Sequence, residues 1–159
     1  MRYPGKAVIV TGGTKGIGEG CVRAFVGAGS RVVFCARDTA AGNDLAARLT
    51  AEGPGEAVFL RCDVSRPDEV EALVDATVAR LGQLDCLVDN AGWHPPHKPI
   101  DDFSPQDFRA LFELNVMSMF VACRRALPHL RRTRGNIVNV SSLVGAMGQL
   151  HATTYVATK

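Results

Sequence analysis

Five short apolar runs alternate along this chain of 159 residues with longer stretches of mixed polarity. The runs are rich in Val, Ile, Leu and Phe and show little alternation of polar and apolar residues, a pattern typical of strands covered on both faces. Strands that alternate with helices in this way form a parallel sheet with right-handed crossovers. The sequence therefore predicts an α/β fold, a Rossmann-like doubly wound parallel sheet. Its strands are expected at residues 7–11, 31–36, 57–63, 84–90 and 136–141.

The stretches between the runs are expected to be helices, and two of them have recognisable starts. Ser65 is followed three residues later by Asp68, and Ser104 is followed by Pro105 and then by Asp107. In such patterns the serine caps the helix, and proline fits its first position. Helices are expected at residues 16–27, 40–52, 66–81 and 105–132, and an exposed loop is expected at 92–102.

Composition narrows the classes of partner. The hydrophobic content of 47% is enough for one good core, so a single domain is expected. The net charge of +2 is small and the basic residues are scattered, which argues against nucleic acid or an anionic membrane as a partner. No apolar run has the length of a signal peptide or a membrane span, so we expect a cytoplasmic protein with small-molecule partners. The five cysteines include no CxxC motif, which favours reduced, buried thiols.

The segment TGGTKGIG, residues 11–18, follows the first predicted strand. Ligands of doubly wound sheets bind beyond the carboxyl ends of the strands, so this loop is a candidate binding site. Gly12 would permit a tight exit from the strand, Gly16 would let a pyrophosphate approach the backbone, and Gly18 would let the next helix pack closely. The alternative is a turn without a ligand. The segment fits a P-loop poorly, because Lys15 is followed by glycine instead of the Ser or Thr that would hold magnesium.

The end of the chain carries the residues with the clearest chemistry. Tyr155 and Lys159 are one helical turn apart, and Ser142 lies thirteen residues before the tyrosine. Each feature alone has a plain alternative, such as a surface pair or a turn serine. Their order and spacing behind a glycine-rich loop indicate a nicotinamide-dependent oxidoreductase.

Several segments together resemble the short-chain dehydrogenase/reductase family, and the resemblance runs from end to end. They are TGGTKGIG, Cys62-Asp63-Val64, Asn90-Ala91-Gly92, Asn115, NVSSLVG around Ser142, and YVATK. Within the family, RYPGK, VRAFV, HPP and SSLVGAMGQ are similar to 17-beta-hydroxysteroid dehydrogenases. The resemblance implies hydride transfer between a nicotinamide cofactor and a secondary alcohol or ketone, with a hydroxysteroid as a candidate substrate. The alternative is a module of the same fold that binds a nucleotide or a partner and performs no chemistry.

The resemblance also implies four catalytic residues. Tyr155 would exchange a proton with the substrate oxygen, although a free phenol, with a pKa of about 10, is too weak a base at neutral pH. Lys159 would supply a positive charge that favours the phenolate, and it would also bind the nicotinamide ribose. Ser142 would orient the reacting oxygen, and Asn115 would hold a water that relays protons to Lys159.

The family pattern places further residues around the cofactor and the substrate. Asp63 and Val64 would lie at the adenine, and Asn90 and Gly92 beside the adenosine ribose, although a turn or capping role for Asp63 is an open alternative. Expected contacts of the phosphate loop are Gly12, Thr14, Lys15, Gly16, Ile17 and Gly18.

The loop after the fourth strand holds the candidate substrate contacts. Trp93 and His94 are expected to meet the substrate together with Ser142. His94 and His97 form an HxxH pair, but no third ligand is evident, so no metal is expected. Asp89 stands where many members of the family carry an asparagine.

Cofactor preference is expected to depend on the end of the second strand. Members that prefer NAD carry an acidic residue there, whereas this chain has Ala36 followed by Arg37. No carboxylate would repel a 2′-phosphate, and Arg37 with Lys15 could bind one. We therefore favour NADP(H), with NAD(H) as the alternative if Arg37 is only a solvated charge. Asp38 is interpreted as the residue that starts the next helix.

The family pattern continues beyond Lys159 with another helix, two further strands and a segment over the substrate. We therefore expect residues 1–159 to form a single dinucleotide-binding domain that is an amino-terminal portion of a longer enzyme. The predicted helix at 105–132 is apolar around much of its circumference, which suggests that it is buried on more than one side. This favours a homodimer or homotetramer of the full-length form.

Overall fold

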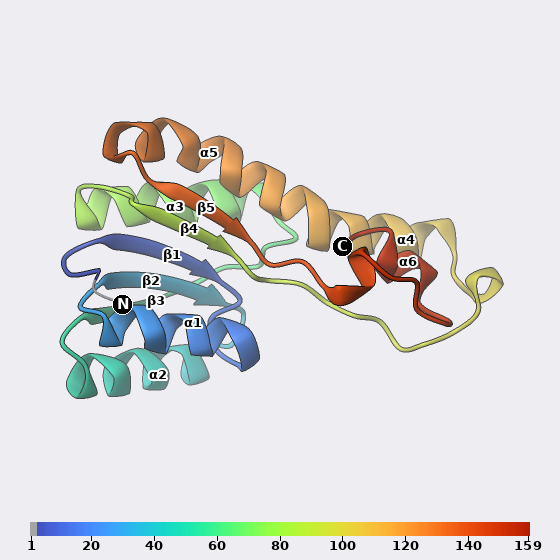
Figure 1. Ribbon diagram of the computed structural model, residues 1–159, viewed down its shortest axis with the longest axis horizontal. Helices are drawn as coiled ribbons and strands as arrows, with labels where there is room; N and C mark the ends of the chain where they lie inside the picture. Colours follow the sequence, from blue (N-terminus) through green and yellow to red (C-terminus); the bar gives the residue numbers. More distant parts are fainter. Residues whose placement is uncertain (1–2) are drawn as a thin grey trace.

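The structure, a computed structural model, describes residues 3–159. Its centre is a five-stranded sheet in the order β3-β2-β1-β4-β5, in which every neighbouring pair is parallel (Figure 1). The predicted doubly wound fold is thereby confirmed. The strands are β1 (Ala7–Thr11), β2 (Arg31–Ala36), β3 (Glu56–Arg61), β4 (Cys86–Asp89) and β5 (Asn136–Asn139).

Helices cover both faces of the sheet (Figure 1). Alternate residues of β1 point to opposite faces of the sheet: Ile9 packs with side chains of α3 and α5, and Val10 packs with side chains of α1 and α2. Burial on both faces explains why the strand residues are apolar without alternation. The helices are α1 (Gly16–Gly27), α2 (Thr39–Glu52), α3 (Pro67–Leu81), α4 (Pro105–Phe112), α5 (Ser118–Thr133) and α6 (Thr153–Val156).

Helix starts agree with the sequence prediction at two positions. The Ser104 hydroxyl accepts a hydrogen bond from the Asp107 N–H at 3.0 Å, and the Asp107 carboxylate accepts one from the Ser104 N–H at 3.0 Å. Asp38 accepts from the Ala41 N–H at 3.1 Å and caps α2, as predicted.

The predicted cap of α3 is wrong. The helix begins at Pro67, and Arg66 occupies the capping position without a side-chain hydrogen bond. The Ser65 hydroxyl donates to the Asp63 carboxylate at 2.8 Å, and the same oxygen accepts from the Ser65 N–H at 3.0 Å. Ser65 is therefore used in a turn that Asp63 organises, one of the roles left open for Asp63.

The continuous helix predicted at 105–132 is interrupted. A single π-helical turn, η2 (Glu113–Met117), separates α4 from α5, and it contains the fully buried Asn115. The extra residue in a π turn changes which side chains face inward, and such turns are frequent at functional sites. The loop after β4 is mostly exposed, as predicted, but Pro95 is buried and Ile100–Asp102 form a 3₁₀ turn, η1.

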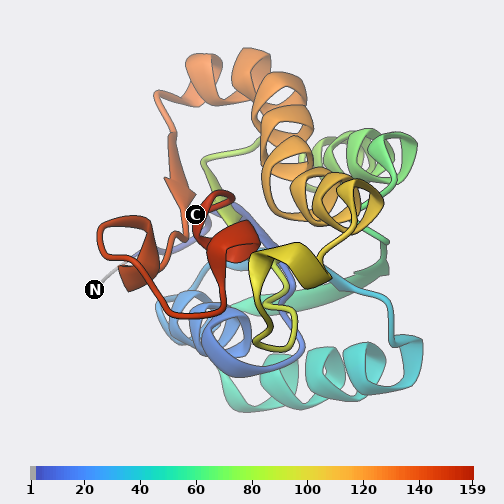
Figure 2. The same ribbon diagram turned by 90° about the vertical axis from the view of Figure 1, so that its right-hand side faces the viewer.

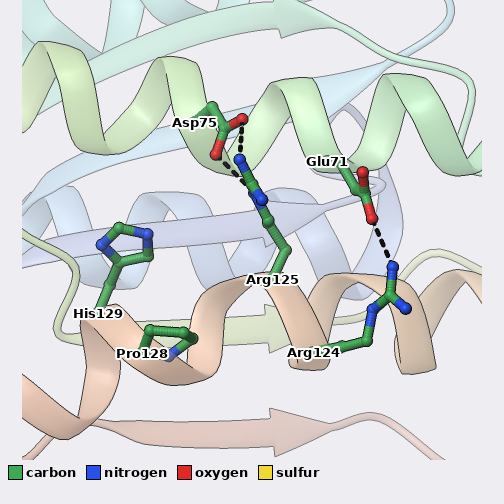
Figure 3. A pocket seen from close by; sticks show the side chains of 6 residues that line it. All are labelled: Glu71, Asp75, Arg124, Arg125, Pro128 and His129. Atoms are coloured by element: carbon green, nitrogen blue, oxygen red, sulfur yellow. Dashed lines mark hydrogen bonds and ion pairs between the residues drawn. The ribbon is translucent and has the colours of Figure 1, made fainter.

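The long α4–α5 segment is fixed against the body of the protein by α3. Arg124 pairs with Glu71 at 2.8 Å, and Arg125 makes two contacts with Asp75, the shorter at 2.6 Å (Figure 3). The far end of this segment extends beyond the carboxyl ends of the strands, where α4 and α6 contact each other (Figures 1 and 2). All five cysteines are free, and within residues 3–159 no helix is long and apolar enough to cross a membrane.

Candidate active site

The glycine-rich loop follows β1, which lies between β2 and β4 in the sheet. The order of the strands reverses at β1, so the loop stands at the switch point. Gly12 and Gly16 have positive φ values of 67° and 58°, which a residue with a side chain adopts only with strain. A Cβ on Gly18 would overlap the carbonyl oxygen of Gly12 and the amide of Asn90, so Gly18 fulfils the packing role predicted for it. A Cβ on Gly16 would instead face open space, which leaves room for a ligand over the loop.

The amino terminus of α1 is suited to bind an anion. Lys15 occupies the capping position, and its side chain forms no capping hydrogen bond to the first N–H groups. These groups carry the positive end of the helix dipole. Ile17 is 68% exposed and Thr14 half-buried on the same loop.

Asn90 and Thr11 tie the end of β4 to the glycine-rich loop. The Asn90 side-chain amide donates to the carbonyl oxygens of Thr11 at 2.9 Å and Gly12 at 3.1 Å. The Thr11 hydroxyl accepts from the N–H groups of Asn90 and Ala91, each at 3.0 Å. The amide predicted to lie beside the adenosine ribose is thus used within the protein, and Asn90 holds the loop in shape. Sequence reasoning missed Thr11, whose only signal is its place before the glycines.

The opposite side of the loop is bordered by the ends of β2 and β3. Arg37 is exposed, and within residues 3–159 it forms no ion pair. Hydrogen bonds from Ser65 hold the pKa of Asp63 below its ordinary value, and the positive charge of Arg37 acts in the same direction. Arg37 therefore lies near enough to Asp63 for their charges to interact. Val64 packs half-buried against the core.

Asn115 and Lys159 both lie next to Gly92, beyond the end of β4, and the Asn115 amide bonds to Thr158 in the segment that carries Tyr155 and Lys159. Asn115 donates to the Trp93 carbonyl oxygen at 3.0 Å and accepts from the Trp93 N–H at 2.9 Å, which fixes the loop after β4. The Lys159 ammonium donates to the Val140 carbonyl oxygen at 3.2 Å, and it would lie 3.0 Å from a Cβ on Gly92. A side chain at position 92 would therefore press on the Lys159 ammonium. Burial lowers the pKa of Lys159.

The segment that carries Tyr155 and Lys159 differs from the predicted helix. The α6 helix ends at Val156, and the N–H groups of Thr158 and Lys159 then bond three residues back, to Tyr155 and Val156. Ser142 begins the 3₁₀ turn η3 (Leu143–Gly145), where its hydroxyl accepts from the Val144 N–H at 3.4 Å. No hydrogen bond joins Ser142 to Tyr155 within the described residues, so its role stays a prediction.

Two loops meet over the Tyr155 ring. The imidazole of His94 lies 4.1 Å from it, centroid to centroid, and stacks on His97 at 4.9 Å. The Gln149 side chain lies between the two histidines, 3.3 Å from the Nε2 atom of each. Gln149 was missed by sequence reasoning, because a glutamine in a glycine-containing loop carries no signal of its partners. Trp93 is 51% exposed beside them. No group of three potential metal ligands occurs among residues 3–159.

A parallel sheet with an open glycine-rich loop at its switch point is the architecture of doubly wound α/β proteins, which bind ligands at the carboxyl ends of their strands. The chain belongs to the short chain dehydrogenase family, whose sequence model matches residues 6–159.

Individual relatives agree with this assignment. L-fucose dehydrogenase of Oryctolagus cuniculus is 51% identical over 158 residues, which cover 99% of this chain and 54% of that enzyme. A 7alpha-hydroxysteroid dehydrogenase complexed with NADH and 7-oxo glycochenodeoxycholic acid superposes with a TM-score of 0.92 at 32% identity, over 99% of this chain and 61% of that one. An alcohol dehydrogenase from the archaeon Thermococcus sibiricus, complexed with 5-hydroxy-NADP, superposes with a TM-score of 0.92 at 29% identity. The match covers 96% of this chain and 65% of that enzyme. The chain thus spans about half the length of the first of these enzymes.

Proposed function

We propose that the protein carrying this chain is a nicotinamide-dependent oxidoreductase that interconverts a secondary alcohol and a ketone. The observation that carries the proposal is that Lys159 and Asn115 both lie next to Gly92, beyond the end of β4, and that Asn115 bonds to Thr158 in the segment that carries Tyr155 and Lys159. Residues 1–159 are proposed to form the dinucleotide-binding domain of a longer enzyme.

The residues of the loop fit a dinucleotide. The positive φ of Gly16, the open space over it and the uncapped α1 amino terminus suit a pyrophosphate. The bound nicotinamide would supply or accept the hydride. Ile17, Asn90 and Gly92 are proposed to lie along the cofactor: Ile17 is exposed on the glycine-rich loop, Asn90 holds that loop in shape, and Gly92 lies next to Lys159.

The chain's own residues perform the proton transfer in this proposal. The Tyr155 hydroxyl donates a proton to the carbonyl oxygen during reduction and accepts it back during oxidation. The half-buried ammonium of Lys159 stabilises the phenolate, because a positive charge favours the ionised form of a neighbouring phenol. Ser142 is proposed to orient the reacting oxygen.

Two substrate classes are supported by different observations. The L-fucose dehydrogenases among the relatives support a sugar, and His94 with Gln149 would offer hydrogen bonds to several hydroxyls. The likeness of the loops to 17-beta-hydroxysteroid dehydrogenase type 14 supports a steroid, and the exposed Trp93 would cover an apolar ring. We propose Trp93, His94 and Ser142 as substrate contacts in both cases.

Assays of the full-length protein distinguish these possibilities. Hydride transfer is expected with at least one member of a panel of L-fucose, other monosaccharides, hydroxysteroids and their ketones, followed by the absorbance of the reduced nicotinamide. Dinucleotide binding without turnover on any member would instead support a catalytically inactive binding module.

The assembly state is proposed from the outer face of the long helical segment. Phe112, Phe120 and Leu127 are 38%, 56% and 38% exposed on α4 and α5. Large apolar side chains in such numbers on one segment favour burial against a second copy. A homodimer or homotetramer of the full-length form is the expected result of sedimentation analysis.

We propose that the cofactor is NADP(H), with NAD(H) as the alternative. Ala36 leaves no carboxylate at the end of β2, and the exposed guanidinium of Arg37, which forms no ion pair within residues 3–159, would bind a 2′-phosphate together with Lys15. One well-formed charged hydrogen bond is worth about 1.5–3 kcal/mol, or roughly tenfold or more in affinity.

Replacing Ala36 by aspartate is expected to swing the preference toward NAD(H). The new carboxylate would bind both ribose hydroxyls and repel the 2′-phosphate. Dissociation constants of both cofactors are measured on the wild type and on Ala36→Asp, with Arg37→Gln as the matched variant that should weaken NADP(H) binding only. Wild-type binding that favours NAD(H), or a preference unmoved by Ala36→Asp, would show that Arg37 points into solvent.

A further inference from the structure

One buried hydroxyl lies at the centre of the proposed catalytic group without a role assigned so far. Thr158 is 4% exposed and stands between Tyr155 and Lys159 in the chain. Its Oγ1 accepts a hydrogen bond from the Asn115 side-chain amide at 2.9 Å and donates one to the Tyr155 carbonyl oxygen at 2.8 Å. Both the donor and the acceptor capacity of the hydroxyl are therefore used.

The hydroxyl completes a chain of hydrogen bonds through Asn115. One hydrogen of the Asn115 amide goes to the Trp93 carbonyl oxygen and the other to Thr158, while its oxygen accepts from the Trp93 N–H. Through Asn115, the loop after β4 and the π turn are joined to the backbone of Tyr155. The Thr158 hydroxyl is the side-chain group by which the Tyr–Lys segment takes part in these hydrogen bonds.

The Tyr–Lys segment needs such an anchor. The α6 helix has four residues, and helices of this length are not stable by themselves in water. Its placement therefore depends on tertiary contacts, which α4 and the hydrogen bond from Asn115 provide. Figure 2 shows α6 lying beside α4 at the carboxyl end of the sheet.

We propose that Thr158 is a positioning residue: its hydroxyl couples Asn115 to the backbone of Tyr155 and so sets where the Tyr155 phenol and the Lys159 ammonium lie. The proposal rests on the oxidoreductase function proposed above. Removing the hydroxyl would leave one Asn115 hydrogen unpaired in a buried place and would release the Tyr–Lys segment from the π turn.

Thr154 offers a matched control. It lies four residues before Thr158, is 6% exposed, and its Oγ1 is the one buried side-chain N or O atom within residues 3–159 that has no hydrogen-bond partner. The replacement of either threonine by valine conserves shape and removes a hydroxyl. The two variants therefore differ in whether hydrogen bonds are lost.

The test compares Thr158→Val, Thr158→Ser, Thr158→Ala and Thr154→Val in the full-length enzyme. In Thr158→Val, kcat is expected to fall about tenfold to a hundredfold with the dissociation constant of the dinucleotide nearly unchanged. Thr158→Ser, which keeps the hydroxyl, should restore kcat, and Thr154→Val should retain wild-type kinetics.

The outcomes separate this proposal from the one on which it rests. A wild type without hydride transfer would refute the proposed function. An active wild type with equal kinetics in Thr158→Val and Thr154→Val would overturn the positioning role. If Thr158→Val does not fold, Thr158→Ala and Thr158→Ser decide: the alanine variant should lose turnover and the serine variant should keep it, and equal loss in both would assign the effect to the methyl group.

Discussion

Replacing Tyr155 by phenylalanine in the full-length enzyme is expected to lower kcat by about 10²- to 10⁴-fold and to leave dinucleotide affinity nearly unchanged. The variant loses the hydroxyl that would exchange a proton with the substrate oxygen, and general acid–base catalysis contributes an effect of this size. The aromatic ring remains to pack 4.1 Å from His94, so the fold of the site should persist. Steady-state kinetics and cofactor titration measure the two quantities.

The chain offers a matched control in its other tyrosine. The Tyr3 hydroxyl lies 3.4 Å from the Asn136 side chain, at the opposite end of the sheet from Tyr155. Tyr3→Phe should therefore have wild-type turnover. Near-normal turnover in Tyr155→Phe would remove Tyr155 from the mechanism.

A second comparison tests which serine orients the substrate. Ser142→Ala is expected to slow the reaction, because Ser142 matches the family's position for this role. The Ser141 hydroxyl instead donates to the Lys159 carbonyl oxygen at 2.7 Å. A larger loss in Ser141→Ala than in Ser142→Ala would shift the assignment by one residue.

The sheet and the positions of its ligand loops could be predicted from the sequence because their signals are local. The bounds of β1, β2 and α1 agree with the prediction. The two strands are apolar runs buried on both faces, and glycines or charged residues mark where such runs end. Gly18 was also predictable, because a helix that starts directly behind a strand leaves no room for a side chain.

The features that the sequence did not predict depend on partners that are distant in the chain. The π turn contains no glycine or proline that would mark an interruption of the helix, and it is recognisable only from the contacts of Asn115 with residues 22 and 43 positions away. Gln149 and Thr158 acquire their neighbours in the same way. Ser65 was misassigned because a serine that can cap a helix can equally form a turn with a preceding aspartate.

Asp89 is the buried charge for which we expect the largest effect on stability. It ends β4 and is 3% exposed, and its carboxylate accepts a hydrogen bond from the Cys123 thiol at 3.4 Å. Burial raises the pKa of Asp89 to about 7, and the pKa of the Cys123 thiol is raised to about 12 by burial and by Asp89. A carboxyl of the unfolded chain titrates at about 3.9.

The sign of the effect follows from the direction of this shift. Between about pH 4 and pH 7 the folded protein keeps a proton on Asp89 that the unfolded chain releases, so Asp89 lowers the stability progressively as the pH rises through this window. Below it both states are protonated, and above it the loss is constant, at most about 4 kcal/mol. Asparagine has the same shape and no charge to bury.

Asp89→Asn is therefore expected to raise the free energy of unfolding by up to about 4 kcal/mol at pH 8 and to leave it nearly unchanged at pH 4. Denaturant unfolding at a series of pH values measures the difference. Asp63→Asn provides a control of opposite sign: hydrogen bonds from Ser65 lower the pKa of Asp63, so this variant should lose stability at neutral pH, and the loss should fade as the pH falls below about 4. A gain in Asp89→Asn that is equal at all pH values would show that the amide forms better contacts and that the buried charge is not the cause.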